Sequence, residues 1–518
     1  MKNMLFVSCI CACLFFTTAL HSQDLTLPLT NNTSACTNQS YCYQSFQALS
    51  DPAQPSPNVY EAAPQNTSKI SLRKLMYPNS STLLLAHFQP WFKQGAQKIA
   101  TGYNSNDLTT VSAQLDDMVS RGFQGVVIDW YGQHGGEFDG WSDGTTRKIR
   151  NNTAGRCSGP QNCPILFAIM EDKGALAYGN LCAPLPHVST TQDCINAFER
   201  DFSYISSSSG GNYFASKAYM KIDPSTQHVS SSGRPAVFIF QPDPTEYSSG
   251  IDWTSPNGVW QTVWNWAINN AGNPLFYFEN AFAGPFGGNS GFTNGTFAWP
   301  NWDGGTSGWI GTEDQDDPQA FGYLTRDFYD PSLNYYSSQA IIGAAWSGFD
   351  DYDSFGHTNN WNHPVIYPRC ATTFVQSFQQ MLSYYSQSRQ LPFLGVATWN
   401  DYDEGTELET GLDNCVSSFT EALNGHILSW DIQFGSSEGY SGSESSVYNY
   451  LIYYSMDGTH LYKVGTIPQG THQVDLCVIF PGGTNATMYV EAQGMPSVFN
   501  HLTNGSVQWN GVQCTYHP

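Results

Sequence analysis

Positive charge is scarce in this sequence. Its 518 residues include 20 Lys and Arg against 43 Asp and Glu, which gives a formal net charge of −23 at pH 7. Nucleic acids and anionic lipid surfaces are bound through clustered basic side chains, so this balance argues against both as partners. Charged residues of either sign make up only 12% of the chain, whereas aromatic residues make up 14%.

Long apolar runs are missing beyond the first twenty residues. Lys2 precedes an apolar stretch at 4–20, and small or polar residues follow at 21–23. This order is typical of a secretory signal peptide. A retained membrane anchor is the alternative, but the run is short for a span of roughly 20 residues and no basic cluster follows it. We expect residues 1–22 to be cleaved and the mature chain to be a secreted monomer outside any membrane.

Motifs for metals, phosphates and activated serines are also absent. No GxSxG, HExxH or phosphate-loop pattern occurs, and the cysteines and 12 His lack metal-ligand spacing. We therefore expect no metal and no cofactor. Of the 13 cysteines, three lie at 9–13, and the even number that remains in an exported chain indicates disulfides. Neighbouring cysteines are expected to pair as Cys36–Cys42, Cys157–Cys163, Cys182–Cys194, Cys370–Cys415 and Cys477–Cys514.

Strand-length apolar runs alternate with helix-like stretches between residues 82 and 423. Continuous apolar strands separated by helices are typical of a parallel sheet covered on both faces, and eight of them predict an α/β fold with a closed (β/α)8 barrel. An open doubly wound sheet is the alternative, but no Gly-rich loop follows the first strand. The predicted strands are Leu83–Phe88, Gly125–Trp130, Ile165–Glu171, Ala236–Gln241, Leu275–Glu279, Trp309–Gly311, Ile341–Trp346 and Phe393–Trp399. The predicted helices are Thr109–Arg121, Thr191–Ile205, Val259–Asn270 and Ala371–Ser388.

Two further segments flank the barrel. Residues 23–81 are rich in Asn, Ser, Thr and Pro without periodicity and are expected to form an extended leader. Residues 424–518 contain short, often alternating strands and a hairpin signal at 456–459. This pattern predicts a small all-β sandwich of immunoglobulin or fibronectin type. Packing support is a more common role for such a domain than glycan binding.

Functional groups recur at the carboxyl ends of the predicted strands, where barrel active sites are built. Aromatic side chains stack on sugar rings, so a secreted chain rich in Trp and Tyr fits carbohydrate handling. A buried or helix-capping role is the alternative for each polar residue. The candidate substrate-binding residues at or near these ends are His87, Trp91, Asp129, Trp130, Tyr131, Glu171, Glu279, Trp346, Asp350, Trp399, Asn400 and Tyr402.

The segment 394–409 is the most informative in the chain. An apolar strand runs into Trp399 and Asn400, and five carboxylates then fall within nine residues. Asp401 and Glu404, three positions apart, would lie above the barrel mouth. Like charges held close together raise the pKa of at least one partner, which supplies the acid and the base or nucleophile that glycoside hydrolysis requires. A solvated acidic loop or a cation site is the alternative.

The same segment resembles the signature of glycoside hydrolase families 99 and 71, the endo-α-mannosidases and endo-α-1,3-glucanases. Residues 400–402 look like the glucanases and residues 404–409 like the mannosidases, while 85–92 and 122–132 resemble the first and second strands of both. The resemblance implies Glu404 as general acid. It implies that Asp401 assists a sugar 2-hydroxyl, as in the mannosidases, or activates water, as in the glucanases.

The resulting prediction is a secreted, endo-type hydrolase of an α-linked glycan such as α-1,3-glucan or α-mannan. The rival from another class is a non-catalytic glycan-binding or adhesion protein, which would not need paired carboxylates. A metal-dependent polysaccharide esterase is the second rival, and the histidine spacing does not favour it.

Overall fold

The computed structural model describes residues 67–92, 103–133, 141–242, 249–280, 294–300, 321–334, 340–350, 365–437, 439–458, 460–480, 485–511 and 514. The predicted signal peptide, most of the leader, the pair Cys36–Cys42 and the strand predicted at Trp309–Gly311 lie outside these residues. The predicted domain limits stay predictions.

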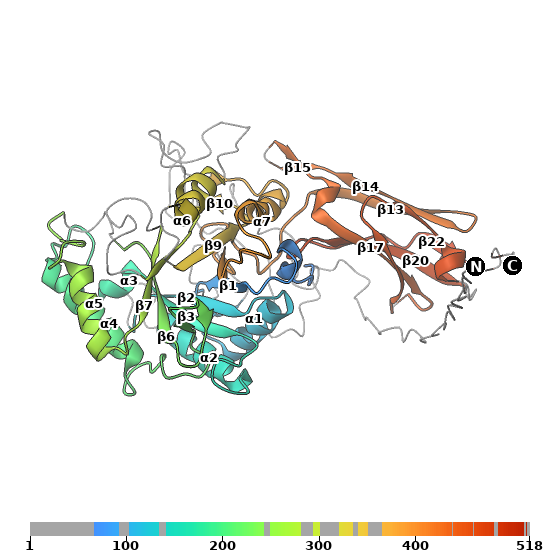
Figure 1. Cartoon of the computed structure of the whole chain (residues 1–518). Helices are drawn as coiled ribbons and strands as arrows, with labels where there is room; N and C mark the ends of the chain where they lie inside the picture. Colours follow the sequence, from blue (N-terminus) through green and yellow to red (C-terminus); the bar gives the residue numbers. More distant parts are fainter. Residues whose placement is uncertain are drawn as a thin grey trace, which may run out of the picture.

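Parallel strands close into a barrel, which lies at the left of Figure 1. Each strand pairs in parallel with the next along the chain, and the last pairs with the first, so the predicted (β/α)8 fold is confirmed. The eight strands are β1 (Leu83–Phe88), β2 (Gly125–Trp130), β3 (Leu166–Glu171), β6 (Arg234–Ile239), β7 (Leu275–Glu279), β8 (Gly295–Phe297), β9 (Ala340–Trp346) and β12 (Phe393–Ala397).

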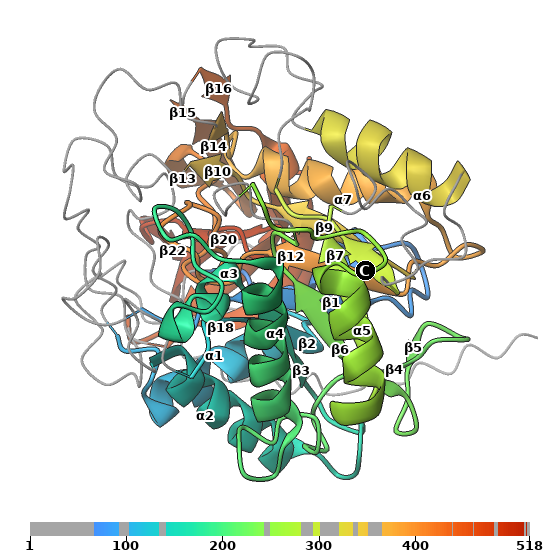
Figure 2. The same cartoon turned by 90° about the vertical axis from the view of Figure 1, so that its left-hand side faces the viewer.

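Helices cover the outside of the barrel, and α4 and α5 stand in front of it in Figure 2. The longer helices are α1 (Leu108–Ser120), α2 (Trp141–Arg156), α4 (Thr191–Ser206), α5 (Val259–Asn270) and α7 (Thr372–Tyr384). The sequence did not reveal α2, because its Asn, Thr and Gly content lacks a clear apolar stripe. The shorter elements are η3 (Leu72–Leu75), α3 (Lys173–Leu176), η5 (Tyr178–Asn180), β4 (Lys221–Asp223), β5 (His228–Val229), η8 (Tyr323–Tyr329), α6 (Asp330–Asn334), β10 (Phe349–Asp350) and β11 (Val365–Ile366).

Alternate residues of each barrel strand face opposite layers. Leu85, Val127, Ala168 and Phe238 belong to the core that fills the barrel, whereas their chain neighbours pack in the layer between strands and helices. Because side chains alternate along a strand, this parity decides which residue at a strand end reaches the mouth.

The sixth barrel strand is β8, Gly295–Phe297, which pairs with β7 on one side and β9 on the other. This corrects the prediction of Trp309–Gly311 for that place. The strand has three residues and begins with glycine, so no apolar run marks it. Its glycine is needed because a Cβ at Gly295 would lie 2.3 Å from the Ala340 carbonyl oxygen.

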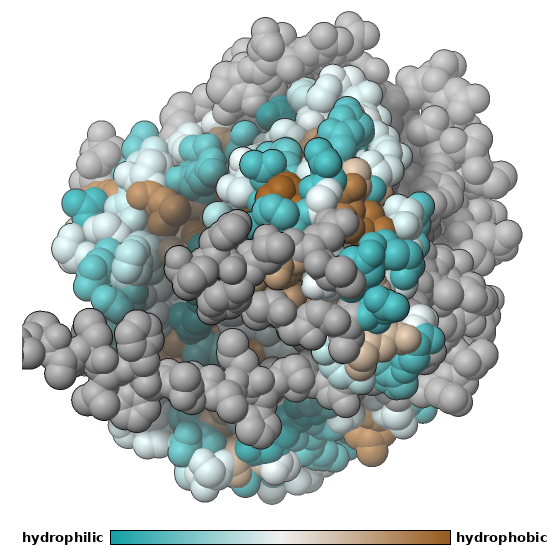
Figure 3. All heavy atoms as spheres, turned by 90° about the vertical axis from the view of Figure 1, so that its right-hand side faces the viewer, coloured by the Kyte–Doolittle hydropathy of each residue, from teal (hydrophilic) through white to brown (hydrophobic). Residues whose placement is uncertain are grey.

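The C-terminal region is antiparallel and all-β, as predicted, and lies at the right of Figure 1. One sheet contains β13, β14 and β19, a second contains β17, β18, β20, β21 and β22, and their apolar faces share one core. Figure 3 views this end, where hydrophobic residues are scattered among hydrophilic ones. The elements are β13 (Val416–Asn424), β14 (Ile427–Phe434), β15 (Ser436–Ser437), β16 (Tyr440–Ser441), η9 (Glu444–Ser446), β17 (Val447–Ser455), β18 (Tyr462–Pro468), β19 (Gln473–Asp475), α8 (Leu476–Ile479), β20 (Ala486–Gly494), β21 (His501–Leu502) and β22 (Val507–Trp509).

The C-terminal region also packs on the barrel. The Leu412 N–H donates to the Ser497 carbonyl and the Phe499 N–H donates to the Leu412 carbonyl, at 2.8 and 3.0 Å. Val498, between them, is buried in the same core that joins the barrel strands to their helices. None of the helices in the described ranges is long and apolar enough to cross a membrane.

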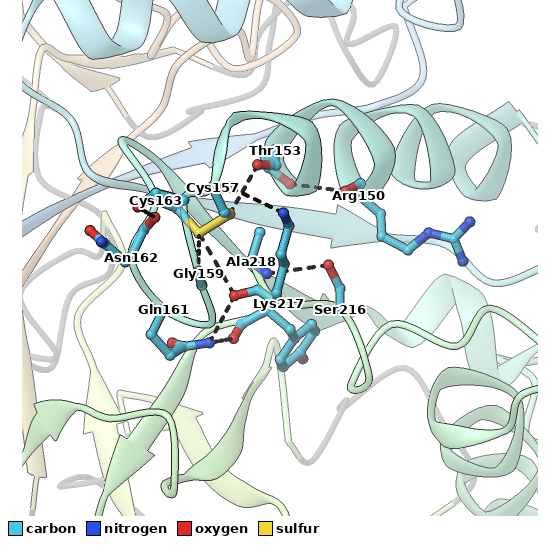
Figure 4. The surroundings of a disulfide bond; sticks show 12 residues. Arg150, Thr153, Cys157, Gly159, Gln161, Asn162, Cys163, Ser216, Lys217 and Ala218 are labelled. Atoms are coloured by element: carbon cyan, nitrogen blue, oxygen red, sulfur yellow. Dashed lines mark hydrogen bonds between the residues drawn. A yellow bond between two sulfur atoms is a disulfide. The ribbon is translucent and has the colours of Figure 1, made fainter.

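Four predicted disulfides are present: Cys157–Cys163, Cys182–Cys194, Cys370–Cys415 and Cys477–Cys514. Figure 4 shows the first, which closes the turn after α2, where the Lys217 ammonium donates to the Cys157 carbonyl at 3.0 Å. That turn precedes β3 and therefore lies at the end of the barrel opposite the mouth. Disulfides of this number fit an oxidising, extracellular compartment.

The Cys370–Cys415 bridge should stabilise the protein more than the Cys157–Cys163 bridge. Their partners are 45 and 6 residues apart, and loop entropy predicts losses of about 4 and about 2 kcal/mol when each pair is replaced by serine. Denaturant unfolding of the two double variants measures both. Equal losses, or a larger loss at the shorter loop, would contradict the expectation.

Candidate active site at the barrel mouth

Among the described residues, a group of five carboxyl side chains stands at the mouth of the barrel. Asp129 occupies the inward position near the end of β2 and is 5% exposed. Burial raises its pKa well above the ordinary value, and the charges of Asp172, Asp401, Glu404 and Glu279 raise it further, in that order. All five residues stand at or just after the carboxyl ends of barrel strands, which places them at the same end of the barrel. We call these five residues the acidic mouth.

Asp401 begins the loop after β12 and is held by its own turn. Its N–H donates to Thr398 Oγ1 at 2.8 Å, and its Oδ1 accepts the N–H groups of Asp403 and Glu404 at 3.1 Å each. Gly405 then turns the chain at a φ of 60°, a conformation that glycine adopts without strain. Burial, followed by the charge of Asp403, raises the pKa of Asp401 to about 8, against the opposing effect of the two N–H donors.

Glu404 lies on the same turn and is half-buried. Its carbonyl accepts the Asp350 N–H at 2.8 Å, which ties the turn to β10. The structure therefore brings the two predicted catalytic carboxyls to one rim of the barrel, with the Asp350 backbone beside them. Glu279, at the end of β7, accepts the Gln241 N–H on Oε2 at 2.8 Å and the Asn280 amide on Oε1 at 3.0 Å.

A buried network supports the turn from below. Asn400 accepts the Gln89 N–H at 2.8 Å and donates to the Gln89 carbonyl at 2.9 Å. These two hydrogen bonds join the segment after the first barrel strand to the segment after the last. The phenol of Tyr402 donates to Glu409, which also accepts the phenol of Tyr103. Asn400 and Tyr402 are thus fully buried supports of the loop, and neither side chain faces the open mouth.

Replacing Glu409 by Gln should destabilise the protein. Glu409 is fully buried and accepts hydrogen bonds from Tyr402, Tyr103 and the Gln114 amide at 2.8, 2.9 and 2.6 Å. The glutamine amide at position 409 would place its own N–H donor opposite one of these three donors and leave that hydrogen bond unmade. We therefore expect the free energy of unfolding to fall by roughly 2–3 kcal/mol. Thermal unfolding measures this loss. Glu199→Gln is the control, because Glu199 lies on α4 and is only half-buried. Equal melting temperatures for both variants would contradict this role.

His87 lies inside the barrel, beneath the mouth. Its ring is 4.9 Å from the ring of Trp299 and 5.8 Å from that of Phe297, and neither ring nitrogen has a hydrogen-bond partner. Burial lowers its pKa to about 3, so the imidazole is neutral. Gly395 makes room for it, because a Cβ there would lie 2.8 Å from Nε2.

Four predicted binding residues face away from the mouth. Trp130, Trp346 and Trp399 are fully buried in the layer between barrel and helices. Trp130 donates to Asp143 at 3.2 Å, and the Trp399 ring lies 4.9 Å from the Arg121 guanidinium. The fourth, Glu171, has its pKa raised by burial and then by Asp201 of α4. Strand parity explains Trp130 and Glu171, which occupy outward positions of β2 and β3.

Two predicted aromatic residues do accompany the acidic mouth. The rings of Trp91 and Tyr131 lie 4.9 Å apart at an interplanar angle of 68°. Burial raises the pKa of Tyr131, and the charges of Asp172, Asp129, Asp401 and Glu404 raise it further. The two rings therefore lie beside the carboxyl groups of the mouth.

Asp172 was not predicted. It follows Glu171, the last residue of β3, continues the inward parity of Ala168 and Met170, and caps α3 by accepting the Gly174 N–H at 2.6 Å. Of the charged groups it acts most strongly on Asp129. The closed barrel fixes the parity of β3, and this parity places Asp172 rather than Glu171 at the mouth.

The described residues contain one group with metal-ligand spacing, His426, Asp475 and Cys477. Cys477 is bonded to Cys514, so its sulfur is not a thiolate ligand. The group lies in the C-terminal sheets, away from the mouth.

The fold and site define a (β/α)8-barrel protein with paired carboxyls at its mouth. Neither a family model nor a curated protein matches the chain. Its structure is similar to that of the family 99 endo-alpha-mannosidase from Bacteroides thetaiotaomicron, with 11% identity over 64% of this chain and 88% of that chain, at a TM-score of 0.41. A glycoside hydrolase-like protein shows 12% identity over 64% and 87%, also at 0.41. One of these two proteins is from family 99, one of the two families that the sequence resembles. The case for an activity rests on the residues of the mouth.

Proposed function

We propose that this protein is a secreted glycoside hydrolase that cleaves an α-linked glycan. The observation that carries the proposal is the pairing of Asp401 and Glu404 on one turn at the barrel mouth, with the pKa of Asp401 raised to about 8. A buried carboxyl at this rim therefore holds a proton near neutrality, and the reaction needs one carboxyl that donates a proton and one that accepts it. The α linkage follows the resemblance of residues 400–409.

In the proposed mechanism Glu404 donates a proton to the departing glycosidic oxygen. Asp401, once deprotonated, accepts a proton from water or from a sugar hydroxyl and stabilises the positive charge that develops at the sugar ring. Trp91 and Tyr131 contact the bound sugar, and Asp129 and Glu279 accept its hydroxyl hydrogens. The buried network around Glu409 keeps the turn rigid, which preserves the geometry of the pair.

Release of new reducing ends tests the proposal. Purified protein is incubated with α-1,3-glucan, α-mannan and other α-glycans, and the product anomer is followed by NMR. Hydrolysis that disappears with Glu404→Gln supports the assignment. Binding without release on every glycan would favour the rival, a non-catalytic glycan-binding protein.

A further inference from the structure

Several asparagines of this chain stand in the acceptor sequence for N-linked glycans. That sequence is Asn-x-Ser or Asn-x-Thr, where x is not proline, and it marks surface segments of secreted proteins. It occurs at Asn31, Asn32, Asn38, Asn66, Asn79, Asn151, Asn294, Asn485 and Asn504. The first four lie outside the described residues, and the structure separates the other five by their exposure and their place in the fold.

Two of these asparagines lie toward the end of the barrel opposite the mouth. Asn79 is exposed and precedes β1, and its carbonyl accepts the side-chain amide of Gln390, which precedes β12, at 3.4 Å. Asn151 is exposed in the second half of α2, the helix that ends at the disulfide-closed turn of Figure 4. A glycan on either residue would therefore extend into solvent away from the acidic mouth.

Two more of them are exposed in the C-terminal sheets. Asn485 directly precedes β20, and Asn504 lies in the loop between β21 and β22, where Gly505 turns the chain at a φ of 72°. Surface loops of this kind accept a large polar group because one side of the segment faces solvent.

Asn294 differs from these four residues. It is only partly exposed, its Oδ1 accepts the Phe276 N–H at 3.0 Å, and its own N–H donates to the Phe276 carbonyl at 2.9 Å. Thr296, which completes its acceptor sequence, is fully buried in β8. A glycan on Asn294 would stand against the paired starts of β7 and β8 and hinder their pairing. We therefore expect Asn294 to be unmodified in the folded, secreted protein.

The acceptor sequences avoid the stretches of chain that directly follow the barrel strands. Asparagines do occur there, among them Asn106, Asn180 and Asn257, but none is followed at the second position by Ser or Thr. These stretches belong to the end of a (β/α)8 barrel at which substrate enters. Glycans attached only at the acceptor sequences would leave that end open.

Resting on the secretion proposed above, we propose that N-linked glycans are attached at the four exposed positions, Asn79, Asn151, Asn485 and Asn504, and that the mouth stays free of them. The donor is an oligosaccharide carried on a polyprenol diphosphate in the secretory compartment. The bond between the sugar C1 and the diphosphate oxygen breaks, C1 bonds to the asparagine Nδ2, and Nδ2 gives up one proton. The polyprenol diphosphate leaves with the electron pair of the broken bond.

Site mapping tests the proposal. The full chain is expressed with its own leader in cultured eukaryotic cells, collected from the medium and treated with peptide-N-glycosidase F in ¹⁸O-water, which converts each glycosylated asparagine to labelled aspartate. Peptide mass spectrometry should find the label at the four exposed positions and not at Asn294. A missing label at any of the four would overturn that site, and Asn294 labelled as fully as the others would overturn the selection by exposure.

Single variants provide a matched control. Each loss of one glycan should raise the electrophoretic mobility of the secreted protein by one step, whereas Asn257→Gln, at an exposed asparagine outside any acceptor sequence, should not. The four variants are Asn79→Gln, Asn151→Gln, Asn485→Gln and Asn504→Gln. Mobility that is unchanged in all four would overturn the proposal.

A glycan placed at the mouth end tests the meaning of the distribution. His187 and Val188 are exposed in the loop after β3, and His187→Asn completes an acceptor sequence with Ser189. The added glycan should lower kcat/KM for a polymeric substrate roughly tenfold because it stands where substrate enters. Removal of the natural glycans should leave kcat/KM unchanged. An added glycan without effect, or a natural set whose removal raises kcat/KM as strongly, would overturn the inference that the mouth must stay free.

Secretion, glycosylation and hydrolysis fail separately in these experiments. Retention of the chain inside the cells would overturn the secretion on which the proposal rests. Secreted protein that carries the four glycans but cleaves no α-glycan would overturn the hydrolase and leave the glycan sites assigned.

Discussion

Glu404→Gln should lower kcat by roughly 10³-fold or more on any glycan that the wild-type protein cleaves. The amide keeps the size of the side chain but has no proton to give to the departing oxygen, and general acid catalysis contributes about 10²–10⁴-fold. The half-buried side chain leaves the turn itself unchanged, because its backbone makes the bonds to Asp401 and Asp350. Steady-state kinetics with reducing-end detection measure the loss.

The control for this variant is Asp413→Asn, which also removes one carboxylate, at an exposed position just beyond the loop. It should retain wild-type kcat. A substrate whose leaving group needs no proton, such as a glycosyl fluoride, should restore much of the activity of Glu404→Gln. Near wild-type cleavage of an ordinary glycan by this variant would exclude Glu404 as the acid.

The activity should rise with pH below about 8, over the range in which Glu404 keeps its proton. Asp401 must be ionised to accept a proton, and its pKa is raised to about 8. The active fraction therefore increases as pH approaches that value, and kcat/KM should gain up to about tenfold per pH unit below it. Asp401→Asn should abolish this rise together with most of the activity. A descending limb near pH 8 in the wild-type protein would instead assign the proton-donor role to Asp401.

The raised pKa of Asp401 also predicts how the free energy of unfolding depends on pH. In the unfolded chain Asp401 titrates near its ordinary value of 3.8, whereas the folded protein holds the proton to about pH 8. Between these values the folded state binds more protons, so wild-type stability falls with rising pH, by at most about 1.4 kcal/mol per unit from this group. Asp401→Asn removes this effect, and its melting temperature should exceed that of wild type by a margin that widens from pH 4 to 8. A margin that stays constant with pH would mean that Asp401 ionises freely in the folded protein.

Much of the barrel could be read from contiguous apolar runs. Seven of its strands stand where such runs predict them, because a parallel strand buried on both faces must be apolar throughout. The remaining strand, Gly295–Phe297, is the sixth of the barrel and was not predicted. It is short and begins with a glycine against which the Ala340 backbone packs. A close contact between two segments that are far apart in the sequence leaves no periodic pattern of apolar residues.

The sequence by itself determined the strand runs, four disulfide pairings and the acidic segment that holds Asp401 and Glu404. Only the tertiary structure decided which end-of-strand residues meet. Strands that are apolar on both faces show no alternation, so the pattern cannot tell the inward Asp129 from the outward Trp130, or Asp172 from Glu171. Closure of the barrel sets that parity, and with it the burial and the neighbouring carboxyl groups that raise the pKa of Asp129.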